Sequence, residues 1–378
     1  MFTLAEALEA IKNKPEFSAK DKGSYTVIDY NLNTKDTFFG NTAFDTQILL
    51  NLRGTAFDNT SGKIIRLGYH KFFNYGEFPD IDKVLDFTYN HTITQKLDGS
   101  CIFPLYTNEC IFLGTRAGVT DVSKLADAYL ETSGLKDLYF GFISYCKDID
   151  VTPIFEYCSR KNRVVIDYPE PTLVLTGIRE IDTGKYISRK SVKSIAEDWD
   201  IPLVKAYSSL SKDLADYVDE ISKLENDEGV VIQFSDSGHM LKIKATDYVL
   251  KHKALDQLRF EKDVILLHLN GLMDDIYPIL NTSLADEIKT YAELLNESIF
   301  KCLDEINFEY FKYEHLVGNR KEFALAIKDN KYKQFLFKLC SDINFDVSDM
   351  LFDHCRKNCS TQASTKELKL FLNFHEVY

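Results

Sequence analysis

The chain has 378 residues, with 45 lysines and arginines against 58 aspartates and glutamates, and its formal net charge is −13. This acidic balance argues against a general nucleic-acid coat, which needs a basic surface, although a local basic channel stays compatible with it. Hydrophobic residues at 45% and charged residues at 27% are ordinary globular usage, which argues against a chain disordered throughout.

The N-terminal segment MFTLAEALEAIKNKPEF alternates charged with apolar residues, and it lacks the basic start and apolar stretch of a signal peptide. No apolar run approaches the ~20 residues needed to cross a bilayer. We therefore expect a cytoplasmic protein with no membrane partner. Its eight dispersed cysteines are expected to be free thiols.

Up to about residue 250 the sequence predicts mainly strands. Residues 24–30 and 63–69 are rich in β-branched and aromatic side chains, and 101–106 with 110–115 read as a hairpin. Asp121 is expected to cap a helix that ends near Thr132. Further strands are expected at 154–158, 163–166, 173–178, 229–234 and 240–244.

After about residue 250 the apolar residues recur at helical spacing. One long pattern opens at Ser283 and continues through Leu303, and later segments repeat the same spacing almost without strand signals. We predict an α+β fold: a domain of antiparallel sheets flanked by helices over residues 1–254, then an all-helical domain over residues 255–378.

A lysine at a turn is the first candidate for chemistry. In TQKLDGS, at positions 94–100, Lys96 follows one predicted strand, and Asp98 and Gly99 form a tight turn before the next. Glycine at such a turn lets the backbone approach a phosphate. Alone the motif equally fits a surface turn, since three fixed residues recur by chance in roughly one chain of this length in ten.

Other charged motifs accompany this lysine in a definite order. They are RGTAF with Arg53, KFFN with Lys71, FEY with Glu156, EGVV with Glu228, and LKIK with Lys242 and Lys244. Strand alternation places Lys242 and Lys244 on one face and Ile243 on the other. Two such cations alone are typical of a solvated sheet face, but beside a lysine nucleophile and two glutamates they indicate a triphosphate site.

This ordered series resembles the covalent nucleotidyltransferases, namely polynucleotide ligases and RNA capping enzymes, and most closely the RNA ligase 1 family of T-even bacteriophages. The segments FEYCSRKNRVVIDY, GIREIDTGKYIS, LKIKATDYV and HLVGNRKEFALA are similar to segments of that family, so the resemblance covers nearly the whole chain. It implies a nucleotidyltransferase domain and an ATP-dependent ligase that joins a 5′-phosphate to a 3′-hydroxyl of RNA. The implied intermediates are a lysyl-AMP and an adenylylated RNA 5′ end.

The resemblance also implies roles for single residues. Lys96 would attack the α-phosphorus of ATP as a neutral amine, a form favoured by nearby cations such as Mg²⁺, Lys242 and Lys244. Phosphates would be held by Arg53, Lys71, Lys242 and Lys244. Glu156 would bond a ribose hydroxyl, and Glu228 would help to hold Mg²⁺ or its waters.

Further positions match the family less directly. Asp98 and Gly99 belong to the nucleotide-binding motif, and Arg116 stands where the family has lysine. Tyr248 is a candidate aromatic contact to the nucleotide, with packing at the domain junction as the alternative. Asp274 and Asp275 match an acidic pair that binds a divalent ion in the family, although a solvated turn is the commoner meaning of such a pair.

The helical domain carries a basic stripe between residues 320 and 338. Its members are Arg320, Lys321, Lys328, Lys331, Lys333 and Lys338. A solvated helical face is the default explanation, and a site for a tRNA anticodon stem, the family's role for this domain, is the alternative. The resemblance therefore suggests repair of tRNA cleaved in its anticodon loop, beside a kinase-phosphatase that prepares the RNA ends, in the cytoplasm of an infected bacterium if the chain is phage-encoded.

Three alternatives stay open from sequence alone. A capping-type guanylyltransferase and a DNA ligase share the motifs, yet both usually carry an OB-type barrel after the lysine pair, where this chain has helices. A non-catalytic RNA-binding module is expected to lose Lys96 or the glutamates, and all are present. ATP is preferred to GTP through the resemblance only.

Overall fold

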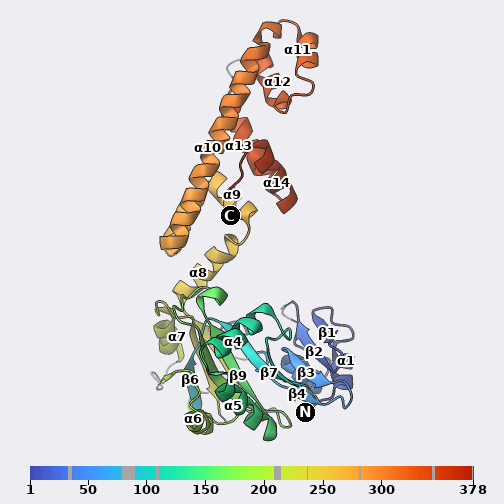
Figure 1. Ribbon diagram of the computed structural model, residues 1–378, viewed down its shortest axis with the longest axis vertical. Coiled ribbons are helices and arrows are strands. Elements are labelled where there is room, and N and C mark those ends of the chain that lie inside the picture. The colour runs from blue at the N-terminus through green and yellow to red at the C-terminus, as the bar shows by residue number, and fades with distance from the viewer. Residues whose placement is uncertain are drawn as a thin grey trace. The chain divides into compact units, whose positions relative to one another are not determined.

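The structure is a computed structural model. It describes residues 1–378 except 33–35, 79–89, 108–109, 208–213, 236, 281, 343–344 and 377. The chain forms two compact units, Met1–Val249 and Leu250–Tyr378. The predicted α+β class is confirmed, because the described part of the first unit holds three sheets with flanking helices, and that of the second is helical (Figure 1).

The first sheet comes from the N-terminal part of the chain and has the order β1-β2-β3-β4, with neighbours antiparallel. Its strands are β1 (Phe17–Asp21), β2 (Tyr25–Tyr30), β3 (Thr55–Asp58) and β4 (Ile64–Arg66). Two helices, α1 (Leu4–Ile11) and α2 (Ala43–Asn51), contribute to its core, where Ile28 and Phe57 meet Leu49. Both helices begin with a capping box, which satisfies their first backbone N–H groups.

The second sheet has the order β10-β9-β7-β8, and its neighbours are antiparallel. Its strands are β7 (Ser100–Tyr106), β8 (Ile111–Gly114), β9 (Val151–Cys158) and β10 (Thr172–Glu180). Helices α4 (Asp121–Thr132), α5 (Lys136–Asp148) and α6 (Arg189–Asp198) supply the other side of its core, with α5 lying against β9 (Figure 1). The cap of α4 is Thr120, one residue before the predicted Asp121, because the Thr120 hydroxyl accepts the Ser123 N–H.

The strand predicted at 163–166 is wrong. These residues form a loop, and the N–H groups of Val165 and Ile166 donate to Asp98 Oδ2 at 2.8 and 2.7 Å. Their apolar sequence reads as a strand, but a buried carboxylate takes the hydrogen bonds that a neighbouring strand would otherwise supply.

The third sheet gathers distant segments in the order β11-β6-β12-β13-β5. Its strands are β5 (Phe73–Asn74), β6 (His91–Gln95), β11 (Ala206–Tyr207), β12 (Gly229–Phe234) and β13 (Met240–Lys244). All pairs are antiparallel except β13 with β5. Ile243 packs into the core beside α7 (Leu214–Ser222), while Lys242 and Lys244 take the opposite face, as the alternation predicts.

Gly229 opens β12 with φ +131, and a Cβ added there would lie 2.0 Å from the carbonyl oxygen of Ile243. We expect Gly229→Ala to lower the free energy of unfolding by at least about 2 kcal/mol, since both the backbone conformation and the contact oppose a side chain. Denaturant titration checks this. Gly23→Ala is the matched control, because Gly23 has φ +85 with nothing within 4 Å, and an equal cost there would contradict the steric argument.

Within its described residues the second unit consists of helices joined by turns, with no strand. Its α-helices are α8 (Thr246–Gln257, which begins in the first unit), α9 (Glu261–Leu269), α10 (Thr282–Tyr313), α11 (Arg320–Ala326), α12 (Lys333–Ser341), α13 (Val347–Lys357) and α14 (Gln362–Phe371). The long α10 buries Ile288, Leu295, Ile299, Cys302 and Ile306 at helical spacing, against α12 and α13 (Figure 1). Among the described residues, every helix is too short or too polar to span a membrane.

Candidate active site

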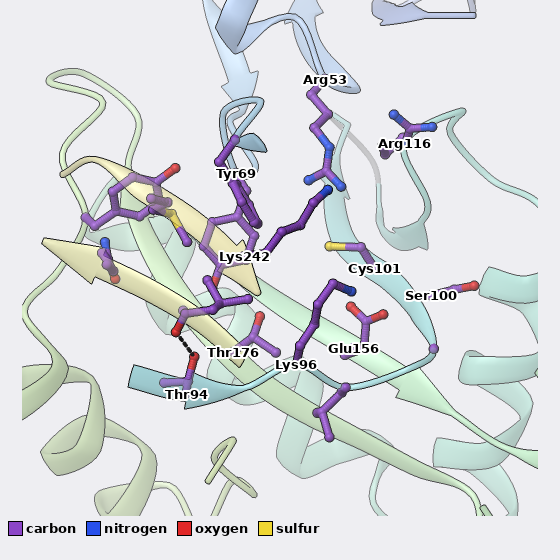
Figure 2. A pocket seen from close by; sticks show the side chains of 18 of the residues that line it. Arg53, Tyr69, Thr94, Lys96, Ser100, Cys101, Arg116, Glu156, Thr176 and Lys242 are labelled. Carbon is purple, nitrogen blue, oxygen red and sulfur yellow. Dashed lines mark hydrogen bonds between the residues drawn. The ribbon is translucent and has the colours of Figure 1, made fainter. Parts of the chain in front are cut away.

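A cavity of about 660 Å³ lies in the first unit between the second and third sheets. Its volume is in the range typical of small-molecule sites. Six predicted site residues line it: Arg53, Lys96, Gly99, Arg116, Glu156 and Lys242. Figure 2 shows Lys96 and Glu156 pointing toward each other, with Lys242 and Arg53 directed at the same space.

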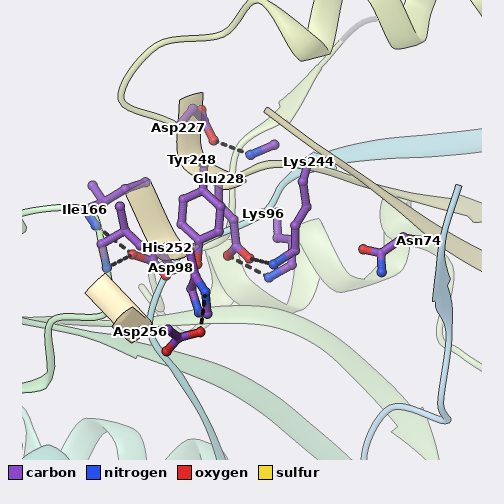
Figure 3. A network of polar contacts seen from close by, with 12 residues as sticks. Asn74, Lys96, Asp98, Ile166, Asp227, Glu228, Lys244, Tyr248, His252 and Asp256 are labelled. Atoms are coloured by element: carbon purple, nitrogen blue, oxygen red, sulfur yellow. Dashed lines mark hydrogen bonds and ion pairs between the residues drawn. The ribbon is translucent and has the colours of Figure 1, made fainter. Parts of the chain in front are cut away.

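Lys96 is held by a buried carboxylate. Its Nζ lies 2.6 Å from Glu228 Oε2, and Lys244 Nζ lies 3.0 Å from Glu228 Oε1 (Figure 3). The two segments are joined by their backbones, because the Lys96 N–H donates to the Gly229 carbonyl at 2.8 Å where β6 pairs with β12. Glu228 has a side chain only 4% exposed, so it fixes both lysines from inside the protein.

Glu156 lies on β9, where it pairs with Cys101 of β7, and its side chain faces Lys96. Burial is the main cause that raises the pKa of Glu156 to about 7; Lys96 opposes the shift, and Glu228 adds to it. A carboxyl with this pKa exchanges its proton near neutral pH, so it can accept or donate a hydrogen bond to a hydroxyl.

Lys242 lies close to several other cationic side chains. Burial, and then the charges of Lys71, Lys96 and Arg53, lower the pKa of Lys242 to about 7. Cations held this close repel one another, and an anion of several charges relieves that repulsion. The arrangement therefore suits a polyphosphate.

The lowered pKa of Lys242 makes stability depend on pH. Below pH 7 the ammonium is charged in both folded and unfolded chains, and its burial is unfavourable. Between pH 7 and its ordinary pKa of 10.5, only the unfolded chain stays protonated, so this cost disappears as pH rises. We expect Lys242→Met to raise the free energy of unfolding at pH 6.5 by on the order of 2 kcal/mol, and the gain to vanish near pH 10.5. Denaturant titrations at both pH values check this; a gain independent of pH would contradict it.

The side chains of Arg53 and Arg116 both contact residues of β2. Arg116 Nη1 lies 3.4 Å from Asp29 Oδ1, and its guanidinium is 4.7 Å from the centre of the Tyr30 ring. Arg53 hydrogen-bonds the Tyr30 side chain. Lys71 lies close by but is buried, with its Nζ 5.1 Å from the centre of the Phe73 ring, and burial lowers its pKa.

Asp98 and Tyr248 face the protein rather than the cavity. The Tyr248 hydroxyl donates to Asp98 Oδ1 at 2.8 Å, while Asp98 Oδ2 accepts the two N–H groups of the 163–166 loop (Figure 3). The Lys244 ammonium lies 4.9 Å from the centre of the Tyr248 ring. The structure thus ties the turn after Lys96 to the start of α8. The nucleotide-binding role of Asp98 and Tyr248 stays a prediction.

Asp274 and Asp275 lie in a 3₁₀ turn of the second unit, Met273–Asp275. Within the described ranges, no group of three or more His, Cys, Asp or Glu side chains is arranged to hold a metal. Mg²⁺ bound mainly by phosphates and waters needs only one or two carboxylates. Glu228 lies beside Lys96, with its oxygens paired to Lys96 and Lys244, and the metal-binding roles of Glu228, Asp274 and Asp275 stay predictions.

Several cavity residues were missed by the sequence reasoning. Tyr69 and Tyr186 stack at 5.7 Å between ring centres and line the cavity, as do Cys101, Thr176 and Met240. Tyr186 falls in the family-like segment GIREIDTGKYIS, which was a usable signal. Tyr69, Cys101 and Met240 carry no local pattern that marks them.

Strands of mainly antiparallel sheets thus border a cavity that contains Lys96. The chain belongs to the RNA ligase family of the T4 RNA ligase 1 type, which it matches over residues 51–256, more than half of its length. The family resemblance drawn from the motifs is therefore confirmed.

Individual relatives carry corresponding names. A Thermovibrio ammonificans protein named "Putative RNA ligase" is 26% identical over 340 residues, 87% of this chain and 84% of its own. A protein of Autographa californica nuclear polyhedrosis virus named "Putative bifunctional polynucleotide kinase/RNA ligase" is 24% identical over 281 residues, 68% of this chain but 39% of its own.

Solved structures of RNA ligases are also similar in part. An archaeal ATP-dependent RNA ligase is 15% identical with a TM-score of 0.46, and the match covers 75% of this chain and 70% of that one. A Naegleria gruberi RNA ligase variant with ATP and Mn is 17% identical with a TM-score of 0.36, covering 46% and 54%. The chain thus spans about half the length of the Naegleria protein.

Proposed function

We propose that this RNA ligase uses ATP to join a 5′-phosphate to a 3′-hydroxyl of RNA through an AMP bound to Lys96. The observation that carries the proposal is the position of Lys96: its amine reaches the cavity that Arg53, Arg116 and Lys242 line, and Glu228 anchors it at 2.6 Å. A positioned amine among cations is what attack on the phosphoanhydride of ATP requires.

The chemistry has three steps. The neutral Lys96 amine attacks the α-phosphorus of ATP, a P–N bond forms, and pyrophosphate leaves. An oxygen of the RNA 5′-phosphate then attacks the AMP phosphorus, which frees the lysine and leaves AMP joined to the RNA end. Finally the 3′-hydroxyl attacks the 5′-phosphorus, and AMP departs.

The charged residues divide this work. Arg53, Arg116, Lys71, Lys242 and Lys244 would hold phosphates and balance the charge of the leaving group. Glu156, with its pKa near neutrality, would bond a ribose hydroxyl. Glu228 would help to hold Mg²⁺ or its waters, and the ion would supply charge neutralisation at the phosphates.

We further propose tRNA cleaved in its anticodon loop as the substrate. The exposed basic residues Arg320, Lys321, Lys328, Lys331, Lys333 and Lys338 of the second unit support this, since phosphate-rich RNA favours such a surface. The viral relative's name joins a polynucleotide kinase to an RNA ligase, which supports a functional pairing with an enzyme that prepares RNA ends.

The test is incubation with Mg²⁺ and ATP labelled at its α-phosphorus, followed by a denaturing gel. We expect label on the protein that pyrophosphate removes, and transfer of that label to 5′-phosphorylated RNA. Label from GTP instead of ATP would contradict the proposed nucleotide. No label from either, with folded protein free of bound AMP, would overturn the proposal.

A further inference from the structure

Arg66 on β4 is a completely buried cation, 0% exposed. Its guanidinium donates to backbone carbonyls: Nε and Nη2 to Gly54 O at 3.0 and 2.5 Å, Nη1 to Thr115 O at 3.2 Å, and Nη2 to Arg116 O at 3.4 Å. Its face covers the Phe103 ring at 5.4 Å. Burial lowers its pKa to about 10, which still leaves it charged at neutral pH.

These carbonyls belong to the two segments that carry the cavity arginines. Gly54 directly follows Arg53, and Arg116 is itself an acceptor of Arg66. The segments touch, because Gly54 has φ +74 and a Cβ added there would lie 2.6 Å from the Arg116 Cα. Arg66, which does not line the cavity, therefore binds the two backbones together.

The side chains of the two arginines both contact residues of β2. Arg116 pairs with Asp29 at 3.4 Å and covers Tyr30, and Arg53 hydrogen-bonds Tyr30. Both line the cavity with Lys96 (Figure 2). Since each side chain is anchored to the same strand, the separation of the two guanidinium groups depends on how closely their backbones are held.

We propose that Arg66 is a positioning residue that fixes the spacing of Arg53 and Arg116, and with it the place of the phosphates before Lys96. The inference rests on the proposed use of ATP. A planar guanidinium with five N–H donors bridges three carbonyls from two segments, a geometry that the single ammonium of lysine does not reproduce. Arg66 does not touch the cavity, so it acts only through the two arginines.

The experiment measures formation of the labelled lysyl-AMP against ATP concentration for Arg66→Lys. We expect the KM for ATP to rise about tenfold or more, since small displacements of positioning groups cost this much. Leu130→Ala is the control: it removes a buried side chain of the α4 core and lowers the melting temperature, but leaves the KM unchanged. An Arg66→Lys protein that melts earlier with an unaltered KM overturns the proposal.

Combination with Arg116→Ala separates positioning from general damage. If Arg66 acts through its neighbours, its substitution raises the KM by a smaller factor when Arg116 is already alanine. If the KM increase of the double variant equals the product of the increases of the two single variants, the proposal is overturned. If Arg66→Lys does not fold, Arg66→Gln is measured in its place, and failure of both to fold also overturns it. Absence of label in the unsubstituted protein would instead refute the proposed function.

Discussion

Replacing Lys96 with alanine is expected to abolish transfer of AMP to the protein, with a loss of at least roughly four orders of magnitude. The lysine supplies the only atom that forms the covalent bond in the proposed first step, so no neighbouring group compensates. The measurement is protein-bound label after incubation with ATP labelled at the α-phosphorus. Lys96→Arg should lose the label equally, because the guanidinium keeps the ion pair to Glu228 but provides no neutral amine near pH 7.

Two controls make this result specific. Lys20→Ala removes an exposed lysine of β1 and should keep normal labelling. Pre-adenylylated RNA bypasses the lysine, because the last step joins two RNA ends directly, and Lys96→Ala should still seal it. If Lys96→Ala is labelled above background, another residue is the nucleophile and the proposed mechanism is refuted.

Glu228→Gln is expected to slow formation of the lysyl-AMP by a factor on the order of 10²–10³. The almost fully buried carboxylate holds Lys96 at 2.6 Å with one oxygen and Lys244 at 3.0 Å with the other. An amide has a single acceptor oxygen, so it cannot hold both amines, and Lys96 loses its position for attack. Single-turnover labelling at saturating ATP measures this rate.

The matched control is Glu225→Gln, an exposed acid three positions earlier that should leave the rate unchanged. Higher Mg²⁺ also distinguishes two roles of Glu228. If the glutamate acts mainly as a metal ligand, excess Mg²⁺ should restore part of the rate; if it acts mainly by holding Lys96, the rate should stay low. A normal rate in Glu228→Gln would show that the Glu228 carboxylate has no role in forming the lysyl-AMP.

Much of the site could be predicted because its residues occur as short motifs. Two of them, Lys96 and Glu228, lie at the ends of strands, and Lys242 and Lys244 lie on one strand. Because side chains alternate between the two faces of a strand, the sequence alone predicts which of them share a face. The change from strand to helix spacing near residue 250 was equally visible. Asp98 shows the limit, since its partners Val165 and Ile166 looked like a strand.

The amino-acid sequence by itself determined the family, the α+β class and the motif residues, because these depend on local spacing and composition. Only the tertiary structure decided which motifs share one cavity, that Glu228 anchors both Lys96 and Lys244, and that Arg66 joins the backbones of Gly54 and Arg116. Burial, ion pairing and pKa depend on neighbours brought together by strand pairing between distant segments. No periodicity within a single segment records those neighbours.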